Sequence, residues 1–346
     1  MDAACYNDSV IRCTLPWTQL HLRETVSVCC WSKAPLGELK DFRTLDEAWN
    51  GPRIRAFRRA MAAGELDGIC ASDCPHRVGG TFTSDRFAVP PTDGESPRRA
   101  VGKAIAEGSE TVPVSPLKLM TSLDDLCSLR CVMCDWNTGK WRIHPAFYDW
   151  LAASAGSLEE LEILGGEPFL SPKVLEVLRH AAGHPPSYEF SFVTSLSHFP
   201  APLLRGIRLK QVIASIDGAT KATYEAVRVG GRWETVMTNL SGLLELQRES
   251  AEPFHVEVHF TVMRRNFAEI ADAVRLFERL AVPLRFYSVN VPPGHPESLF
   301  PVAALQAPLA AAIREGLAAT RDPLTRGSLE AVQQSLRRHV AASLQP

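Results

Sequence analysis

The sequence lacks several features that would each indicate a class of protein. It has no uninterrupted apolar run near the eighteen or so residues of a membrane span, and residues 1–6 do not form a basic start followed by an apolar stretch. Its formal charge is only −2, from 37 basic and 39 acidic residues, and it has no basic stripe. We therefore expect a cytoplasmic protein with neither a membrane nor a nucleic acid as its partner.

Cysteine is missing from most of the chain. Six of the nine cysteines lie between Cys5 and Cys74, three lie between Cys127 and Cys134, and none follows. A disulfide framework is disfavoured, because the cytoplasm keeps thiols reduced and an odd count leaves one cysteine unpaired. The distribution indicates two metal-binding regions instead.

Short apolar runs alternate with helical periodicity from residue 115 onward. The periodicity predicts helices at 172–182 and 266–280, and the runs predict strands at 117–120, 161–164, 190–193, 211–214, 256–260 and 284–287. Strands that alternate with helices favour an α/β fold with a parallel sheet, and a right-handed succession of such units curls into a full or partial barrel. The site of such a fold lies at the carboxyl ends of its strands.

Composition divides the chain into four parts. Residues 1–78 hold the early cysteines, and 79–114, which is rich in Gly, Thr, Ser and Pro, is expected to be a linker. Residues 115–300 are expected to form the barrel. Residues 301–346 contain two amphipathic helices, expected at 305–320 and 328–344, that pack against it.

Three cysteines stand together directly after the first predicted strand of the barrel. Cys127, Cys131 and Cys134 have the spacing C-x₃-C-x₂-C. Three thiolates on one loop can ligate three irons of a [4Fe–4S] cluster and leave the fourth iron open to another ligand. A closed zinc site is the alternative, but it wants a fourth ligand, and neither a nearby cysteine nor a histidine before His144 supplies one.

Further motifs fall where the next predicted strands end. The segment 165–168, Gly-Gly-Glu-Pro, combines glycines that allow close backbone approach with a carboxylate that can accept hydrogen bonds from an ammonium group. Thr194-Ser195 ends the third strand. Strand alternation directs Ser215 and Asp217, at the end of the fourth, to the same side. Residues 261–266, with Arg264 and Asn266, end the fifth strand and are a weaker case.

These motifs resemble those of the radical SAM superfamily over roughly residues 115 to 300. The resemblance implies a partial (β/α)₆ barrel whose open iron chelates S-adenosylmethionine, and an electron from the cluster that breaks the sulfonium bond. The resulting 5′-deoxyadenosyl radical takes a hydrogen atom from the substrate. The family pattern also implies the cofactor contacts, which are Met133, Gly165, Gly166, Glu167, Pro168, Ser195, Ser215 and Asp217.

Each of these contacts has an implied role. Glu167 meets the methionine amino group, Ser195 donates to the methionine carboxylate, and Ser215 and Asp217 bond the ribose hydroxyls. Met133 departs from the family pattern, which usually has an aromatic residue near the adenine at this position. Thr194-Ser195 departs from the usual Thr-Asn-Gly in both later positions.

A second set of cysteines precedes the barrel. The pattern of residues 10–78 resembles the SPASM/twitch auxiliary modules of radical SAM enzymes, and implies a second, fully ligated [4Fe–4S] cluster. Its last pair is spaced C-x₃-C where C-x₂-C is usual, and a zinc knuckle is the alternative. Adjacent strand residues face opposite sides, so only one of Cys29 and Cys30 faces the cluster, and position favours Cys29. The expected ligands are Cys13, Cys29, Cys70 and Cys74.

Two cysteines are then left over, Cys5 and whichever of Cys29 and Cys30 is not a ligand. A spare cysteine is usually a small buried hydrophobe. One that faces the substrate can instead give a hydrogen atom to a product radical.

The sequence thus predicts a radical SAM enzyme that acts on a natural-product scaffold, such as a sugar or another small molecule, or on a peptide. Dehydrogenation, epimerisation and bond formation all remain open. The expected electron donor is a protein such as a flavodoxin or a ferredoxin. The alternative is a non-catalytic iron–sulfur protein that senses redox state or iron, but this would require closed ligation at every cluster. A zinc-stabilised nucleic-acid module is disfavoured by the balanced charge.

Overall fold

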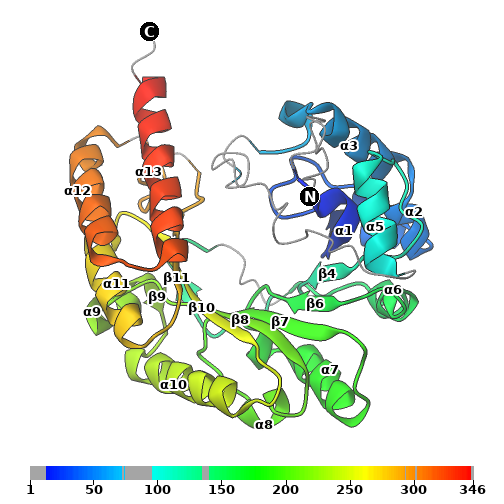
Figure 1. Ribbon diagram of the computed structural model, residues 1–346. Coiled ribbons are helices and arrows are strands. Elements are labelled where there is room, and N and C mark those ends of the chain that lie inside the picture. Colours follow the sequence, from blue (N-terminus) through cyan, green and yellow to red (C-terminus); the bar gives the residue numbers. More distant parts are fainter. Residues whose placement is uncertain are drawn as a thin grey trace, which may run out of the picture. The chain divides into compact units, whose positions relative to one another are not determined.

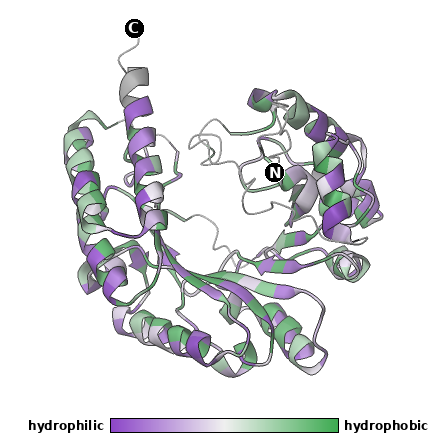
Figure 2. Ribbon diagram, in the orientation of Figure 1, coloured by the Kyte–Doolittle hydropathy of each residue, from purple (hydrophilic) through white to green (hydrophobic). Residues whose placement is uncertain are grey.

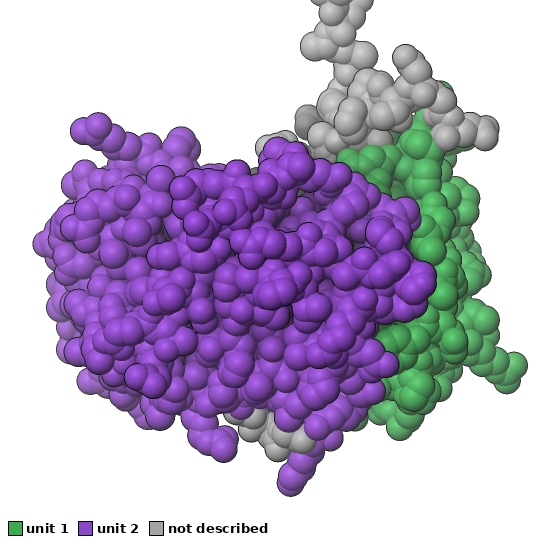
Figure 3. Space-filling model, turned by 90° about the horizontal axis from the view of Figure 1, so that it is seen from below, with its two compact units in different colours: residues 1–121, 143–161 green, residues 122–142, 162–346 purple. Residues whose placement is uncertain are grey.

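The computed structural model describes residues 13–71, 74, 96–134, 140–292, 294–300 and 302–343. The chain forms two compact units, which Figure 3 shows in different colours. Unit 1 comprises Met1–Thr121 and Ile143–Leu161, and unit 2 comprises Ser122–Arg142 and Glu162–Pro346. The four-part division of the sequence at 78, 114 and 300 stays a prediction.

Unit 2 is built on a sheet whose order is β11-β10-β8-β7-β6. Strand β7 pairs in parallel with β8, β8 with β10, and β10 with β11. The predicted α/β fold with a parallel sheet is confirmed, and each predicted strand is present within a few residues of its expected bounds. The strands are β6 (Glu160–Ile163), which begins in unit 1 and ends in unit 2, and β7 (Glu189–Thr194), β8 (Leu209–Ser215), β10 (His255–Val262) and β11 (Leu284–Ser288).

Helices α7 (Pro172–Gly183), α8 (Ala201–Leu204) and α10 (Trp233–Glu249) lie along one face of this sheet (Figure 1). Local signals explain where the helices begin. The Ser171 side chain accepts a hydrogen bond from the backbone N–H of Val174, and a proline follows at the first helical position of α7. Thr220 caps α9 (Lys221–Val227) in the same way.

Strand β10 has two chemically different faces. Residues 256, 258, 260 and 262 are apolar and buried, whereas 255, 257, 259 and 261 are His, Glu, His and Thr. Strand β11 continues both faces, because Phe286 packs on Phe260 and Tyr287 lies against the ring of His259. One face of this part of the sheet therefore belongs to the core, and the other is polar.

The two C-terminal helices pack against the sheet unit, as their amphipathic pattern predicts. Thr325 Oγ1 donates to the Leu284 carbonyl, and Ser328 Oγ accepts from the Phe286 N–H. Helix α12 (Ala303–Ala319) contains many apolar residues, whereas α13 (Pro323–Ser343) is more hydrophilic (Figure 2). Helix α12 packs on α11 (Ile270–Arg279), where a Cβ at Gly316 would come within 2.6 Å of Ile270.

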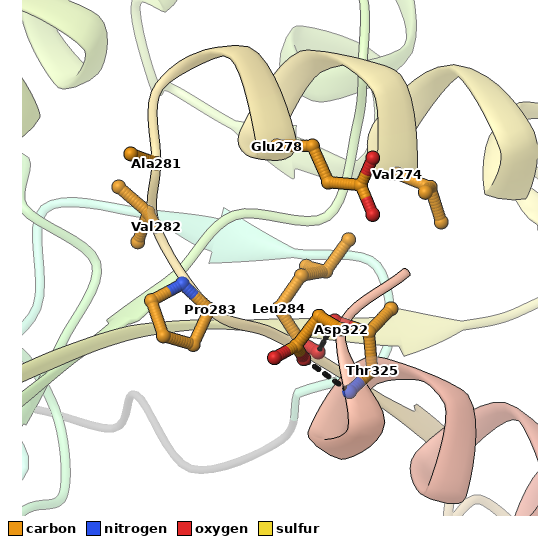
Figure 4. A pocket seen from close by; sticks show the side chains of 8 residues that line it. All are labelled: Val274, Glu278, Ala281, Val282, Pro283, Leu284, Asp322 and Thr325. Atoms are coloured by element: carbon orange, nitrogen blue, oxygen red, sulfur yellow. Dashed lines mark hydrogen bonds between the residues drawn. The ribbon is translucent and has the colours of Figure 1, made fainter. Parts of the chain in front are cut away.

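A cavity of about 220 Å³ lies between α11, the start of β11 and the start of α13 (Figure 4). Its lining includes Glu278, Pro283, Asp322 and Thr325, and the Thr325 N–H donates to Asp322 Oδ2 at 2.6 Å. The cavity is at the amino end of β11. It is therefore not part of the site at the carboxyl ends of the strands.

Unit 1 has its own strands, in the order β4-β1-β2-β3. Strand β1 (Gln19–Leu22) pairs in parallel with β4 (Lys118–Thr121) and antiparallel with β2 (Thr25–Ser27), and β2 pairs with β3 (Gly37–Glu38). The other elements of this unit are α1 (Leu15–Thr18), α2 (Leu45–Trp49), α3 (Pro52–Ala63), α5 (Pro97–Ala106) and α6 (Ala146–Ser154).

Helix α5 lies within the stretch 79–114 that the sequence predicts as a linker. Ser96 caps it by accepting from the Arg99 N–H, Pro97 takes the first helical position, and Val101 and Ala104 are buried. Part of this stretch therefore packs as a helix of unit 1. Residues 75–95 lie outside the described part of the chain.

None of the helices in the described part of the chain combines the length and the apolarity that crossing a membrane requires.

Candidate functional site

The three-cysteine loop of unit 2 is held in place by a short antiparallel pairing. Strand β5 (Arg130–Cys131) pairs with β9 (Arg228–Val229), so that Cys131 lies opposite Arg228. The pairing continues where the Val132 N–H donates to the Val227 carbonyl at 3.0 Å. The Cys134 N–H donates to the Cys131 carbonyl at 3.1 Å, which turns the loop back on itself.

The three thiols differ in exposure but influence one another. Cys127 and Cys131 are half-buried, and Cys134 is exposed. Burial raises the pKa of the Cys131 thiol to about 11, while the positive charge of Arg228 opposes this shift. Burial also raises the pKa of Cys127. Among the described residues, no three Cys, His, Asp or Glu side chains already stand in ligand geometry.

The two glycines after β6 bring the backbone against the cysteine loop. Gly165 and Gly166 have φ of 85° and 28°, in the left-handed region that favours glycine. A Cβ at Gly166 would lie 2.1 Å from the Leu126 carbonyl oxygen, and the Glu167 N–H donates to that oxygen at 2.6 Å. These glycines therefore allow a close approach to the residue just before Cys127.

The Glu167 carboxylate is almost completely buried, with 1% of its surface exposed, and both its oxygens accept hydrogen bonds. Oε1 accepts from Thr194 Oγ1 at 2.6 Å and from the Phe169 N–H at 3.2 Å. Oε2 accepts from the Ser195 N–H at 2.8 Å and from Ser195 Oγ. The implied contacts Glu167 and Ser195 are thus bonded to each other in this structure.

Ser195 has a second acceptor within reach. Its Oγ lies 2.9 Å from Ser197 Oγ, which in turn lies 3.4 Å from the Ser128 Oγ of the cysteine loop. A hydroxyl group can rotate between acceptors. Rotation of Ser195 toward Ser197 would free one position on Glu167 for an ammonium group.

Asp217 is buried and engaged on several sides. Its Oδ1 accepts from the Thr261 N–H at 2.6 Å, and its Oδ2 lies 2.6 Å from Arg228 Nη2. The Asn266 amide donates to the carbonyls of Asp217 and Thr261, and its Oδ1 accepts from the Met263 N–H. Asn266 therefore fixes the end of β10.

Sequence reasoning missed Arg228. Its Nη1 approaches Cys131 Sγ at 3.9 Å, and its side chain is only 10% exposed. Arg228 Nε and the neighbouring Tyr224 Oη are buried and bond no described residue. No motif or spacing distinguishes this arginine, because it meets Cys131 only through a pairing between residues 97 positions apart in the chain.

The remaining implied contacts are placed as follows. Pro168 begins a buried 3₁₀ turn, Pro168–Leu170. Ser215 is half-buried at the end of β8, and Met133 is half-buried within the cysteine loop.

In unit 1, two segments bring three of the early cysteines together. The backbones of Ser32 and Cys70 form an isolated antiparallel β-bridge, and the Ala71 N–H donates to the Trp31 carbonyl at 3.0 Å. Burial raises the pKa of the Cys29 thiol, and the nearby Cys74 adds to this shift.

The adjacent cysteine has different surroundings. Cys30 is exposed and acts electrostatically on Arg23, so Cys29 and Cys30 face different neighbours. Cys13 is half-buried. Cys5, one of the spare cysteines, lies outside the described residues.

The residues of unit 2 fit the cofactors of the predicted family. Cys127, Cys131 and Cys134 supply three thiols from one loop, which matches a cluster with one open iron. Two of the buried polar atoms in unit 2 that lack a hydrogen-bond partner among the described residues, Arg228 Nε and Tyr224 Oη, are of the kind that a polar ligand satisfies.

Comparison with known proteins agrees with this assignment. No family model matches the chain. A GTP 3′,8-cyclase of Listeria monocytogenes is 26% identical over 186 residues, 50% of this chain and 54% of that protein. Mycofactocin maturase MftC of Mycobacterium ulcerans is 26% identical over 205 residues, 56% of this chain and 54% of that protein. The chain thus spans about half the length of the curated relatives that it matches.

Among solved structures, that of Streptococcus suis SuiB aligns with 78% of this chain and 64% of its own, at 12% identity and a TM-score of 0.49. A likeness of this degree is too weak to inform the site. The α/β fold, the three-cysteine loop and the sequence relatives agree with the resemblance to the radical SAM superfamily that the motifs indicate. Members of this superfamily use a [4Fe–4S] cluster and S-adenosylmethionine.

Proposed function

We propose that this protein is an enzyme that reductively cleaves S-adenosylmethionine and removes a hydrogen atom from a substrate. The observation that carries the proposal is the position of the Glu167 turn against Leu126, directly before the first cysteine of the loop. This contact supports the proposal, because it joins the turn that carries a buried carboxylate to the residue before Cys127, the first of three thiols that can leave one iron open. When it is bound to the reduced cluster, S-adenosylmethionine supplies a 5′-deoxyadenosyl radical.

The chain's own residues hold the cofactors. Cys127, Cys131 and Cys134 ligate the cluster, and Glu167 accepts a hydrogen bond from the methionine amino group after the Ser195 hydroxyl turns toward Ser197. We propose that the turn at 165–166 and the side chain of Met133 also contact this cofactor. We propose that Ser215, the last residue of β8, and Asp217, two residues beyond it, contact the ribose hydroxyls.

The polar face of β10 and β11 supports a substrate rich in hydrogen-bonding groups. Glu257 is buried at its centre and accepts from His255 at 3.0 Å, His259 at 2.7 Å and Arg285 at 2.9 Å. His259 also pairs across the sheet with Ser215. The polar face thus reaches the level of Ser215, a predicted ribose contact, which suits a polar small molecule or a peptide better than an apolar compound.

The relatives' names suggest two kinds of substrate and reaction. One relative is a cyclase of GTP, and another is a maturase. A 5′-deoxyadenosyl radical supports dehydrogenation, epimerisation or bond formation, and the groups of the substrate select among them. We propose that the protein acts in the cytoplasm and takes electrons from a flavodoxin or a ferredoxin.

We further propose that Cys13, Cys29, Cys70 and Cys74 ligate an auxiliary [4Fe–4S] cluster. The supporting observations are the β-bridge between Ser32 and Cys70, the electrostatic effect of Cys74 on Cys29, and the exposure of Cys30. A structural zinc ion is the competing occupant.

The proposed function is tested by anaerobic reconstitution with iron and sulfide, followed by incubation with S-adenosylmethionine and dithionite. We expect 5′-deoxyadenosine in the wild-type reaction and none with Cys127→Ala. Cys30→Ser is the matched control, because Cys30 is an exposed cysteine outside both proposed ligand sets. Wild-type protein that carries a cluster but forms no 5′-deoxyadenosine would support the non-catalytic alternative.

A further inference from the structure

Arg228 connects the cysteine loop to the end of β8 in two ways. Its backbone pairs with Cys131 in the β5–β9 ladder, and its Nη1 donates toward Cys131 Sγ at 3.9 Å. Its Nη2 lies 2.6 Å from Asp217 Oδ2, and the Asp217 side chain is fully buried. A cation is therefore held beside one cysteine of the loop by a carboxylate that cannot move into solvent.

The Arg228 side chain keeps its positive charge despite its burial. Burial by itself lowers the pKa of an arginine, but Asp217, and then Cys131 and Tyr224, raise the pKa of Arg228 above its usual value. A buried ion pair of this kind is held firmly only while both partners are present. The guanidinium offers several N–H groups in a fixed plane, which lets it contact Asp217 and Cys131 at the same time.

Such a cation has a specific consequence for a cluster ligated by Cys131. Hydrogen bonds to ligating sulfurs and the net charge nearby are the main protein controls on the reduction potential of an iron–sulfur cluster. Reduction adds one negative charge to the cluster. A nearby cation stabilises the reduced state more than the oxidised state, and so raises the potential.

We propose that Arg228 is a positioning residue that raises the reduction potential of the cluster through Cys131, with Asp217 holding the guanidinium in place. The proposal rests on the proposed function, because it requires a cluster at Cys127, Cys131 and Cys134. The effect brings that cluster within reach of a flavodoxin- or ferredoxin-type donor, which gives up the one electron that the cluster gains.

The test compares the potential of this cluster among variants that change one charge at a time. All variants carry Cys70→Ser and Cys74→Ser, so that only the loop cluster is observed. Asp217→Asn removes the negative partner and is expected to raise the potential. Adding Arg228→Met to Asp217→Asn removes the cation without leaving a buried unpaired carboxylate, and is expected to lower the potential below that of Asp217→Asn. Potentials are measured by anaerobic redox titration, followed by electron paramagnetic resonance.

Two further variants make the comparison specific. Arg228→Lys keeps the charge without the planar fork, so we expect a smaller fall than with the neutral side chain. The matched control is Arg265→Met with Glu297→Gln, a second ion pair in unit 2, in which the half-exposed Arg265 bonds the buried Glu297 at 2.7 Å and the Ala226 carbonyl. This control is expected to leave the potential where it was.

Iron and sulfide content are measured first in every variant. Equal potentials in Asp217→Asn and in the Asp217→Asn/Arg228→Met variant would overturn the inference. If the double variant does not assemble its cluster, Asp217→Asn with Arg228→Gln decides, and a potential there equal to that of Asp217→Asn overturns the inference as well. Failure of the proposed function is distinct, because it appears as missing 5′-deoxyadenosine in protein that retains Arg228.

Discussion

Ser195 Oγ donates a hydrogen bond to Glu167 Oε2 and lies 2.9 Å from a second acceptor, Ser197 Oγ. The family pattern implies that Glu167 and Ser195 contact different groups of one cofactor. In this structure they satisfy each other, and the Glu167 carboxylate holds four hydrogen bonds in all. Cofactor binding at Glu167 therefore requires Ser195 to change partner.

Replacing Ser195 by alanine separates the two roles of its hydroxyl. If the hydroxyl mainly occupies Glu167, Ser195→Ala weakens S-adenosylmethionine binding far less than Glu167→Ala does. Loss of a hydrogen bond to a charged group costs about 1.5–3 kcal/mol, so we expect Glu167→Ala to weaken binding roughly tenfold to a hundredfold. Equilibrium dialysis of reconstituted protein measures both. Equal losses would mean that Ser195 itself bonds the cofactor.

The close approach of Gly166 to Leu126 predicts a strong effect of a single methyl group. Gly166→Ala places a Cβ 2.1 Å from a carbonyl oxygen at a φ of 28°, so the cysteine loop must shift. Overpacking of this kind costs roughly 1–3 kcal/mol. We expect lower stability in denaturant and reduced iron at the loop. Gly156→Ala is the matched control, since nothing lies within 4 Å of its Cβ. A Gly166→Ala protein with full iron content and normal stability would refute the packing described for this turn.

The polar face of β10 makes stability depend on pH. Burial alone raises the pKa of Glu257, but hydrogen bonds from His255 and His259, and the charge of Arg285, lower it far below the usual value. A carboxyl with a lowered pKa contributes stability that is complete above its unfolded pKa of about 4.3, and is lost as the pH falls through the folded value.

Glu257→Gln is therefore expected to destabilise the protein at pH 7 by about 3 kcal/mol, because three donors lose a charged partner. The difference from wild type should shrink as the pH falls below about 4. Urea unfolding at a series of pH values measures it. A difference that stays constant between pH 7 and pH 3 would contradict ionisation of Glu257 as the cause.

The two adjacent cysteines of unit 1 give a direct comparison. Cys29→Ser is expected to reduce the iron of reconstituted protein from about eight to about four atoms per chain, whereas Cys30→Ser should leave it near eight. The reason is that the charge of Cys74 contributes to the raised pKa of the Cys29 thiol, whereas Cys30 is exposed and its charge acts on Arg23. The reverse result would assign the ligand to Cys30. One zinc ion per chain, with iron for only one cluster, would show that unit 1 holds a zinc site.

The sequence was sufficient to predict those features that depend on local pattern. The strands of unit 2 follow from apolar runs, and helices α7 and α11 from periodicity. The glycines at 165–166 could be recognised as a point of close approach, although the group approached is the Leu126 carbonyl in this structure.

Features that depend on distant residues were not predictable in the same way. Arg228 meets Cys131 across a ladder between two short segments, and neither segment has a strand pattern of its own. The link between Ser195 and Glu167 joins the ends of two strands, and its geometry follows from the sheet rather than from either motif. Helix α5 lies in a stretch whose overall composition is that of a linker, and its buried face becomes visible only in the fold.

The central claim is that S-adenosylmethionine is cleaved at the cluster of Cys127, Cys131 and Cys134. The most direct measurement compares two variants, each designed to hold one cluster, by electron paramagnetic resonance of the reduced protein with and without S-adenosylmethionine. Protein with Cys70→Ser and Cys74→Ser should show a spectrum that changes on addition of S-adenosylmethionine, and should form 5′-deoxyadenosine. Protein with alanine at 127, 131 and 134 should show neither effect. A spectral change and 5′-deoxyadenosine in the second variant, or neither effect in a first variant that carries its cluster, would contradict the account.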